Sequence, residues 1–299
     1  MSRKFIFFIN PVSGTKNKFQ LEEKITRKCE EKGLSFEILF TSKEGNYNFL
    51  YQKITKENVT DIAIAGGDGS IRPIVSSVLN LNVNIGIIPV GSGNGLARSA
   101  SIPNSVDKAI DVILEGKPRP ADAFLINRQL STHVCGLGFD AKVAHDFSLA
   151  NDRGLNSYAK IAVKNFTTAR TYPFTIEADG KSFEVEAFLI AIANSNQSGN
   201  NFKVAPKASI CDGLLDIVVV KKSRKAMAVL SFIKQLLSGN IKSIHSKQFH
   251  KNNILYFQTE KIKIVNPRFA PLHIDGDPAE SFKEFSIEIL PSAYNLLQP

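Results

Sequence analysis

Residues 61–70 read DIAIAGGDGS, a short apolar run that ends in a glycine loop carrying one acidic residue. An apolar run of this length bounded by glycines is typical of a buried β-strand. Residues 71–79 follow, and their apolar spacing predicts a helix. A strand, a glycine loop and a helix in this order indicate a parallel sheet covered by helices, in which ligands bind at the carboxyl ends of the strands.

The same alternation continues on both sides of this stretch. Further strands are predicted at 5–9, 36–40 and 85–88, and further helices at 18–32 and 46–57. In the first of these helices Leu21, Ile25 and Cys29 recur every four residues and therefore share one face, and Gly33 follows its end. The pattern predicts an N-terminal α/β domain over residues 1–122.

The pattern changes after Pro118-Arg119-Pro120. Residues 174–177 and 183–193 flank Asp179-Gly180, which predicts a β-hairpin with a type I′ turn. Further extended stretches are predicted at 214–220, 254–258, 261–265 and 285–290, and helices at 157–169 and 226–237. The second half therefore predicts a mainly antiparallel β domain over residues 123–290.

Composition limits the class of protein. The chain has 299 residues, a net charge of +9 and three cysteines without metal-site spacing, which argues against a disulfide framework or a zinc site. Its first apolar run, residues 5–9, is too short for a signal peptide, and no run approaches the ~20 residues of a membrane span. A cytoplasmic protein is expected. No nucleic-acid motif accompanies the positive charge, so no nucleic-acid partner is predicted.

Three loops follow predicted strands and are built from small and polar residues: 10–14 (NPVSG), 66–70 (GGDGS) and 91–95 (GSGNG). Glycines allow the backbone to approach a bulky anion, and each loop leads toward a helix N-terminus, which favours negative charge. Any one loop alone could be a tight turn. Together the three loops predict a cradle for a polyphosphate.

Asp68 is the informative residue of the middle loop. A carboxylate beside a phosphate is repelled unless a cation lies between them, so Asp68 predicts Mg²⁺. Other nucleotide motifs fail: no G-x-x-x-x-G-K-[ST] occurs, and residues 136–141 match G-x-G-x-x-A without a surrounding βαβ unit.

These residues together resemble the catalytic family of diacylglycerol kinases, with loop 91–95 closer to that of sphingosine kinases. The matching segments are NPVSG (10–14), GGDGS (66–70), PVGSGNGLAR (89–98), GFDA (138–141), APKA (205–208), DGLLD (212–216) and IDGD (274–277). They occur in family order over nearly the whole chain. GGDG alone is not specific, because NAD kinases and phosphofructokinases share it.

The resemblance implies an ATP-dependent lipid kinase with an α/β domain, a C-terminal β-sandwich domain and a nucleotide cleft between them. Residues 291–299 would complete the first domain. By motif position, the nucleotide-binding residues would be Asn10, Pro11, Val12, Ser13, Gly14, Thr41, Gly66, Gly67, Asp68, Gly69, Ser70, Ile71, Arg72, Gly91, Ser92, Gly93 and Asn94.

The same resemblance assigns acidic and metal-binding roles. Asp68 and Asp122 would belong to a Mg²⁺-linked network, and Asp277 stands where the family has a glutamate general base; Asp277 or Asp68 would take the proton of the lipid hydroxyl. A structural Mg²⁺ would be held by Ser209, Asp212 and Leu214. The alternative for Asp212-Gly213 is an ordinary β-turn.

Two departures keep the substrate open. Gly95 replaces an aspartate of the family, as in sphingosine kinases, and Asp277 is one methylene shorter than glutamate. The acceptor would be a diacylglycerol-like or a sphingoid lipid taken from the membrane surface. Asp140 and Asp122 are the candidate partners of a sphingoid ammonium, and the alternative for Asp140 is a helix cap. An NAD-kinase-like enzyme and a weakly catalytic nucleotide- or lipid-binding regulator are the rival functions. The oligomeric state stays open, with a homodimer among the alternatives.

Overall fold

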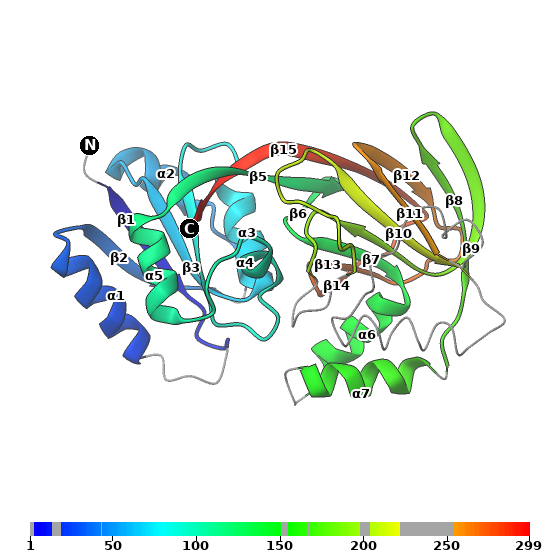
Figure 1. Ribbon diagram of the computed structural model, residues 1–299, viewed down its shortest axis with the longest axis horizontal. Helices are drawn as coiled ribbons and strands as arrows, with labels where there is room; N and C mark the ends of the chain where they lie inside the picture. Colours follow the sequence, from blue (N-terminus) through cyan, green and yellow to red (C-terminus); the bar gives the residue numbers. More distant parts are fainter. Residues whose placement is uncertain are drawn as a thin grey trace. The chain divides into compact units, whose positions relative to one another are not determined.

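A computed structural model describes residues 3–13, 19–42, 44–150, 155–166, 168–197, 204–221 and 254–299. The chain divides into two compact units, Met1–Ala121 with Ser292–Pro299, and Asp122–Pro291. The boundaries drawn from the sequence differ from these by about one residue at each junction. Two long strands, β5 (Lys117–Ile126) and β15 (Glu284–Gln298), each carry the chain across a junction (Figure 1).

The first unit contains a parallel sheet. Its strands are β1 (Lys4–Ile9), β2 (Ser35–Phe40), β3 (Asp61–Gly66) and β4 (Asn84–Pro89). They lie in the order β4-β3-β1-β2, and the end of β15 adds a further parallel strand beside β4. The apolar runs of β1, β3 and β4 are buried on both faces, which is why they read as continuous rather than alternating. The predicted parallel α/β fold is confirmed.

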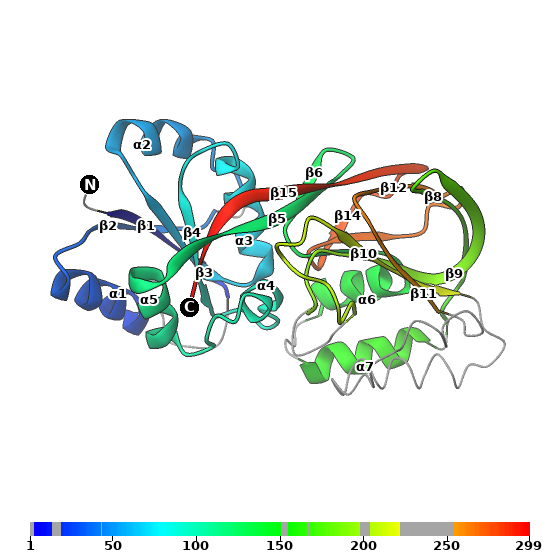
Figure 2. The same cartoon turned by 45° about the horizontal axis from the view of Figure 1, so that its top comes forward.

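Helices cover both faces of this sheet. They are α1 (Phe19–Glu31), α2 (Phe49–Glu57), α3 (Asp68–Val78), α4 (Gly95–Ser99) and α5 (Val106–Glu115). Figure 2 shows α1 and α5 together on one side of the strands and α2 on the other. Ion pairs join α1 to α5: Lys24–Asp107, Lys28–Asp111 and Lys32–Glu115. The lysines recur every four residues and so do the acids, so a row of lysines along α1 pairs with a row of acids along α5.

Asp61 is a buried anion at the amino end of this sheet, with no exposed surface. Two nitrogens of Arg3 donate to its carboxylate at 2.9 and 2.6 Å. Thr60 Oγ1 and Asn84 Nδ2 donate to the same carboxylate. Arg3 also donates to the last carbonyls of α5. Arg3, which directly precedes β1, therefore connects that strand to β3 and to α5.

Replacing Asp61 with alanine should lower the free energy of unfolding by about 3 kcal/mol, because the variant keeps Arg3 without its buried partner. The control is Glu57→Ala, which removes a partly exposed acid that pairs with Lys4 and Lys53, and it should cost clearly less because water screens these pairs. Urea unfolding measures both variants. Equal losses would show that the Asp61 network contributes no more than a surface ion pair.

The second unit is mainly antiparallel, as predicted. Its strands are the end of β5, β6 (Gln129–Ser131), β7 (Val134–Gly138), β8 (Tyr172–Ala178), β9 (Lys181–Ala193), β10 (Leu215–Lys221), β11 (Ile254–Thr259), β12 (Lys261–Val265), β13 (Leu272–Ile274), β14 (Asp277–Ala279) and the start of β15. The β8–β9 hairpin has its turn at Asp179 and Gly180, whose φ angles of 49° and 70° are both positive. That is the requirement of a type I′ turn.

Two cores lie on opposite faces of β9 and β10. Along β9, Ile190 and Ile192 pack among the strands, whereas Leu189 and Ala191 face α6 (Phe139–Ser148) and α7 (Leu155–Phe166). The same alternation occurs along β10. Because both faces are covered, the strand residues are apolar at consecutive positions.

The helical core contains three packed aromatic rings. Phe139 stacks on Phe188 at 4.4 Å between ring centroids, and Phe166 lies edge-on to both. These three phenylalanines belong to the core that joins α6 and α7 to β9.

Several elements differ from the sequence expectation. Pro118 and Pro120 lie inside β5 rather than at a break. The pattern did not predict α4, α5, β7 or α6, and it started α3 three residues late. The expected helix 226–237 lies outside the described residues.

Candidate active site

The predicted phosphate loops start at one level of the first sheet. Ile9 of β1 is level with Ala65 of β3 and with Phe40 of β2, and Gly66 is level with Pro89 of β4. All four strands are parallel, so the segments that follow them emerge at one edge. Thr41 follows β2 directly, and its N–H donates to the carbonyl of Ile9 at 3.0 Å.

Side chains and glycines join these loops. Asn10 Nδ2 donates to Ser70 Oγ at 2.8 Å, which links the first loop to the second. A Cβ on Gly67 would lie only 3.2 Å from the Cα of Gly91, so the second and third loops touch backbone to backbone. Asn94 closes the third loop on itself, donating to the carbonyl of Gly91 and accepting its N–H, both at 2.9 Å. Gly67 and Gly91 are therefore required by close approach.

Asp68 has a role that the sequence did not predict. Its Oδ2 accepts the N–H of Gly95 at 2.9 Å and its Oδ1 accepts that of Leu96 at 3.1 Å. These are the first N–H groups of α4, so the positive end of that short helix binds the carboxylate of Asp68. Asp68 is itself in the first turn of α3. One carboxylate thus ties the second loop to the third.

The other predicted nucleotide-binding residues differ in exposure. Val12, Gly69 and Ser92 are exposed. Ile71 is 1% exposed, so its side chain belongs to the core and only its backbone could approach a ligand. Gly14 lies outside the described residues.

In the second unit, Asp277 begins β14 directly after a hairpin turn. Asp275 and Gly276 form that turn, with positive φ angles of 51° and 87°, and Ile274 pairs with Asp277 across it. The carboxylate of Asp275 is 5% exposed and accepts from the N–H groups of residues 132–134 and from two hydroxyl groups. The turn that leads into Asp277 is therefore anchored by a buried acid.

The sequence reading missed Asp275 as a positioning residue. Its signal was an Asp-Gly pair, which is typical of a hairpin turn. Asp140, the expected partner of an ammonium, lies inside the first turn of α6 rather than in a loop. Its Oδ1 accepts the N–H of Ala141 at 2.9 Å, and its Oδ2 lies 3.2 Å from His273 Nε2.

A second acidic group surrounds the segment expected to bind Mg²⁺. Gly213 N–H donates to Asp122 Oδ2 at 2.8 Å, and Leu214 N–H donates to Asp212 Oδ1 at 3.2 Å. Gly213 has a φ of 72°, a left-handed conformation that glycine adopts readily. Asp68 lies in the first unit and Asp122 in the second, and their joint network remains a prediction.

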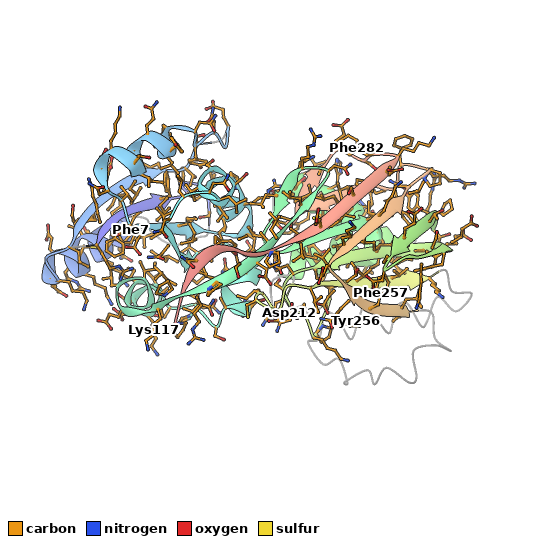
Figure 3. The ribbon with its side chains drawn as sticks, turned by 90° about the horizontal axis from the view of Figure 1, so that it is seen from above. Phe7, Lys117, Asp212, Tyr256, Phe257 and Phe282 are labelled. Carbon is orange, nitrogen blue, oxygen red and sulfur yellow. The ribbon has the colours of Figure 1, made fainter. Side chains whose placement is uncertain are left out.

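Burial and a neighbouring carboxylate raise the pKa of two acids in this group. Partial burial raises the pKa of Asp212, and the charge of Asp122 adds to the shift. Burial raises the pKa of Asp216 to about 7; Asp212 adds to this shift, and a hydrogen bond from Gln258 opposes it. Tyr256 also donates to Asp216, and Figure 3 shows Asp212 and Tyr256 in this part of the unit.

The donor set fits a hard cation in one respect. Carboxylate and carbonyl oxygens are the ligands that Mg²⁺ prefers, and a cation would relieve the repulsion between Asp122 and Asp212. Among the described residues, no group of three or more His, Cys, Asp or Glu side chains is arranged to hold a metal. A site here would therefore depend on backbone carbonyls such as those of Ser209 and Leu214.

Comparison with known families agrees with this division of the chain. The diacylglycerol kinase catalytic domain matches residues 4–126, and the YegS C-terminal NAD kinase β-sandwich-like domain matches residues 133–298. This chain belongs to the YegS-like diacylglycerol kinase family. It is a lipid kinase by family, as the motifs predicted.

Curated relatives of this lipid kinase carry the same names. A diacylglycerol kinase of Bacillus subtilis is 27% identical over 282 residues, covering 93% of this chain and 90% of the relative. A probable lipid kinase YegS-like of Shewanella frigidimarina is 26% identical over 250 residues, covering 81% and 78%.

Solved structures support the fold. The crystal structure of a putative diacylglycerol kinase from Bacillus anthracis has a TM-score of 0.80 at 22% identity and covers 99% of this chain and 96% of that chain. Within the described part of this lipid kinase, no helix is long and apolar enough to cross a membrane.

Proposed function

We propose that this lipid kinase transfers the γ-phosphate of ATP to the hydroxyl of a diacylglycerol-like or sphingoid lipid. One observation carries the nucleotide part of the proposal: three loops at one edge of a parallel sheet are held together by Asn10–Ser70 and by the Gly67–Gly91 approach. Exposed N–H groups and hydroxyls at such an edge suit a polyphosphate. The family gives the acceptor its class, a lipid.

Different residues of the chain would position the phosphates and accept the proton. The loop backbone and the hydroxyls of Ser13, Ser70 and Ser92 position the phosphates. Asp277 accepts the proton of the lipid hydroxyl while the oxygen bonds to the γ-phosphorus and the bond to the β-phosphate oxygen breaks. Phosphoryl transfer depends mainly on positioning and charge neutralisation, and bound Mg²⁺ would supply part of that neutralisation near Asp68 and Asp122.

A direct assay tests the proposal. The purified chain is incubated with ATP labelled at the γ-position, Mg²⁺ and, in separate arms, diacylglycerol micelles, sphingosine micelles or NAD. Label is expected in the lipid extract of at least one lipid arm and not in NAD. Labelled NAD would favour the NAD-kinase-like alternative, and nucleotide binding without transfer in any arm would favour the weakly catalytic regulator.

Asp140 is the residue proposed to distinguish a sphingoid lipid from a diacylglycerol-like lipid. Its carboxylate already accepts N–H groups from Ala141 and His273, so a sphingoid ammonium would have to share it. Both lipids are supplied at equal concentration in mixed micelles. If Asp140 reads an amine, Asp140→Asn lowers sphingosine phosphorylation selectively; an equal loss on both lipids would remove Asp140 as the amine sensor.

Asp212→Ala should lower the melting temperature and reduce the stabilisation that added Mg²⁺ gives, because a native-state ligand is linked to folding. The matched control is Glu280→Ala, which removes an exposed acid outside the proposed metal set. Thermal unfolding is followed over a series of Mg²⁺ concentrations. An Asp212 variant with the wild-type response at every concentration would leave this segment as a turn only.

We also propose where the enzyme works. A lipid acceptor requires it to act at a membrane surface, which suits a cytoplasmic protein peripheral to the membrane with a net charge of +9 facing anionic lipids. Flotation with liposomes of increasing anionic content tests this, and salt should release the bound enzyme.

A further inference from the structure

The hairpin turn before Asp277 is joined to α6 by a single imidazole. Gly276 N–H donates to His273 Nδ1 at 3.3 Å, and His273 Nε2 lies 3.2 Å from Asp140 Oδ2. Since Nδ1 accepts a hydrogen bond, the ring proton of the neutral imidazole is on Nε2, where it is donated to Asp140. Both ring nitrogens are therefore used, and His273 is 6% exposed.

Gly136 of β7 makes room for this pair. A Cβ at that position would lie 2.5 Å from His273 Nε2 and would also collide with the carboxylate of Asp140. The φ angle of Gly136 lies outside the left-handed region, so the glycine is required by lack of space and not by backbone conformation. The two side chains meet over a site that no larger residue could occupy.

The strand that begins with Asp277 is paired on one side with β13 and lies against α6. β14 has three residues and pairs with β13, and it stands at the end of the strand order. Asp275 anchors the first position of the turn, and the His273 bond to Gly276 anchors the second. Gly276 directly precedes Asp277, so this bond sets where the chain enters β14.

We propose that His273 is a positioning residue for the reaction: its neutral ring, held by Asp140, fixes the Gly276 N–H and thereby the carboxylate of Asp277. This rests on the proposed role of Asp277 as the base. A base must be within ~2.6–3.2 Å of its proton, directly or through one water, so a small shift of the turn lowers the rate. Because the side chain of Asp277 is short, it cannot extend toward the lipid hydroxyl to compensate for such a shift.

Two substitutions separate the two bonds of the ring. In His273→Asn the amide oxygen takes the place of Nδ1 and can accept from Gly276, whereas in His273→Gln the amide nitrogen takes the place of Nε2 and can donate to Asp140. We expect His273→Asn to keep kcat within about threefold and His273→Gln to lose about tenfold or more, as misplacement of a catalytic group does. KM for ATP should stay unchanged in both, because the loops proposed to bind ATP lie in the other unit.

A spectroscopic measurement tests the same bonds without activity. Long-range ¹H–¹⁵N spectra of histidine-labelled wild type should show the Nε2–H tautomer for His273, with His273→Asn used to assign the signal. The other tautomer, or equal kcat for the Asn and Gln variants while wild type phosphorylates lipid, overturns the positioning role. Wild type that phosphorylates no lipid overturns the proposed function itself, and the role of His273 with it.

Discussion

Asp68→Asn should lower kcat by at least ~10²-fold, the loss expected when a key electrostatic group is removed from a phosphoryl-transfer site. The amide oxygen of the variant can still accept one of the two N–H groups, from Gly95 or Leu96. Its NH₂ group then points at the remaining N–H, and two donors cannot form a hydrogen bond. We therefore expect the third loop to loosen while both units stay folded. Labelled transfer to lipid and the melting temperature measure the two effects.

The two roles of Asp68 make different predictions about Mg²⁺. If the carboxylate helps to hold the metal, the variant needs more Mg²⁺ for half-maximal rate. If it acts only by capping α4, the Mg²⁺ dependence stays unchanged and KM for ATP rises. Asp107→Asn, which breaks a surface pair with Lys24, is the matched control and should behave as wild type. Near wild-type turnover in Asp68→Asn would remove this residue from the mechanism.

Asp277→Asn should lower kcat by about 10²–10⁴-fold, the range of a general base, with KM for lipid changed only slightly. The amide keeps the size of the side chain and removes its proton affinity. Asp277→Glu supplies the longer carboxylate of the related diacylglycerol kinase motif and should keep activity well above that of the Asn variant.

Glu280→Gln is the control for Asp277, because Glu280 is an exposed acid three residues further along the chain. We expect it to leave kcat unchanged. If Asp277→Asn were as active as this control, the proton would have to be taken by another group, and Asp68 would be the next residue to test.

Much of the first unit was determined by the sequence alone. Continuous apolar runs such as 5–9 and 62–65, each followed by a glycine loop, are local patterns that specify buried parallel strands and place their loops at one edge. The Asp179-Gly180 turn was equally local, because few residues tolerate two positive φ angles in succession. The structure confirms the predicted α/β and antiparallel β units.

Only the tertiary structure decided how individual polar residues are used. Asp68 was read from its own loop as a metal-linked carboxylate, but its bonds to Gly95 and Leu96 come from a segment 27 and 28 residues away. The bond from His273 to Asp140 spans 133 residues. A hydrogen bond between distant segments leaves no local pattern, whereas a strand buried on both faces leaves a continuous apolar run that can be read directly. The sequence therefore determined the main strands of the first sheet and where their glycine loops lie, and the packing of distant segments decided which partner each acid has.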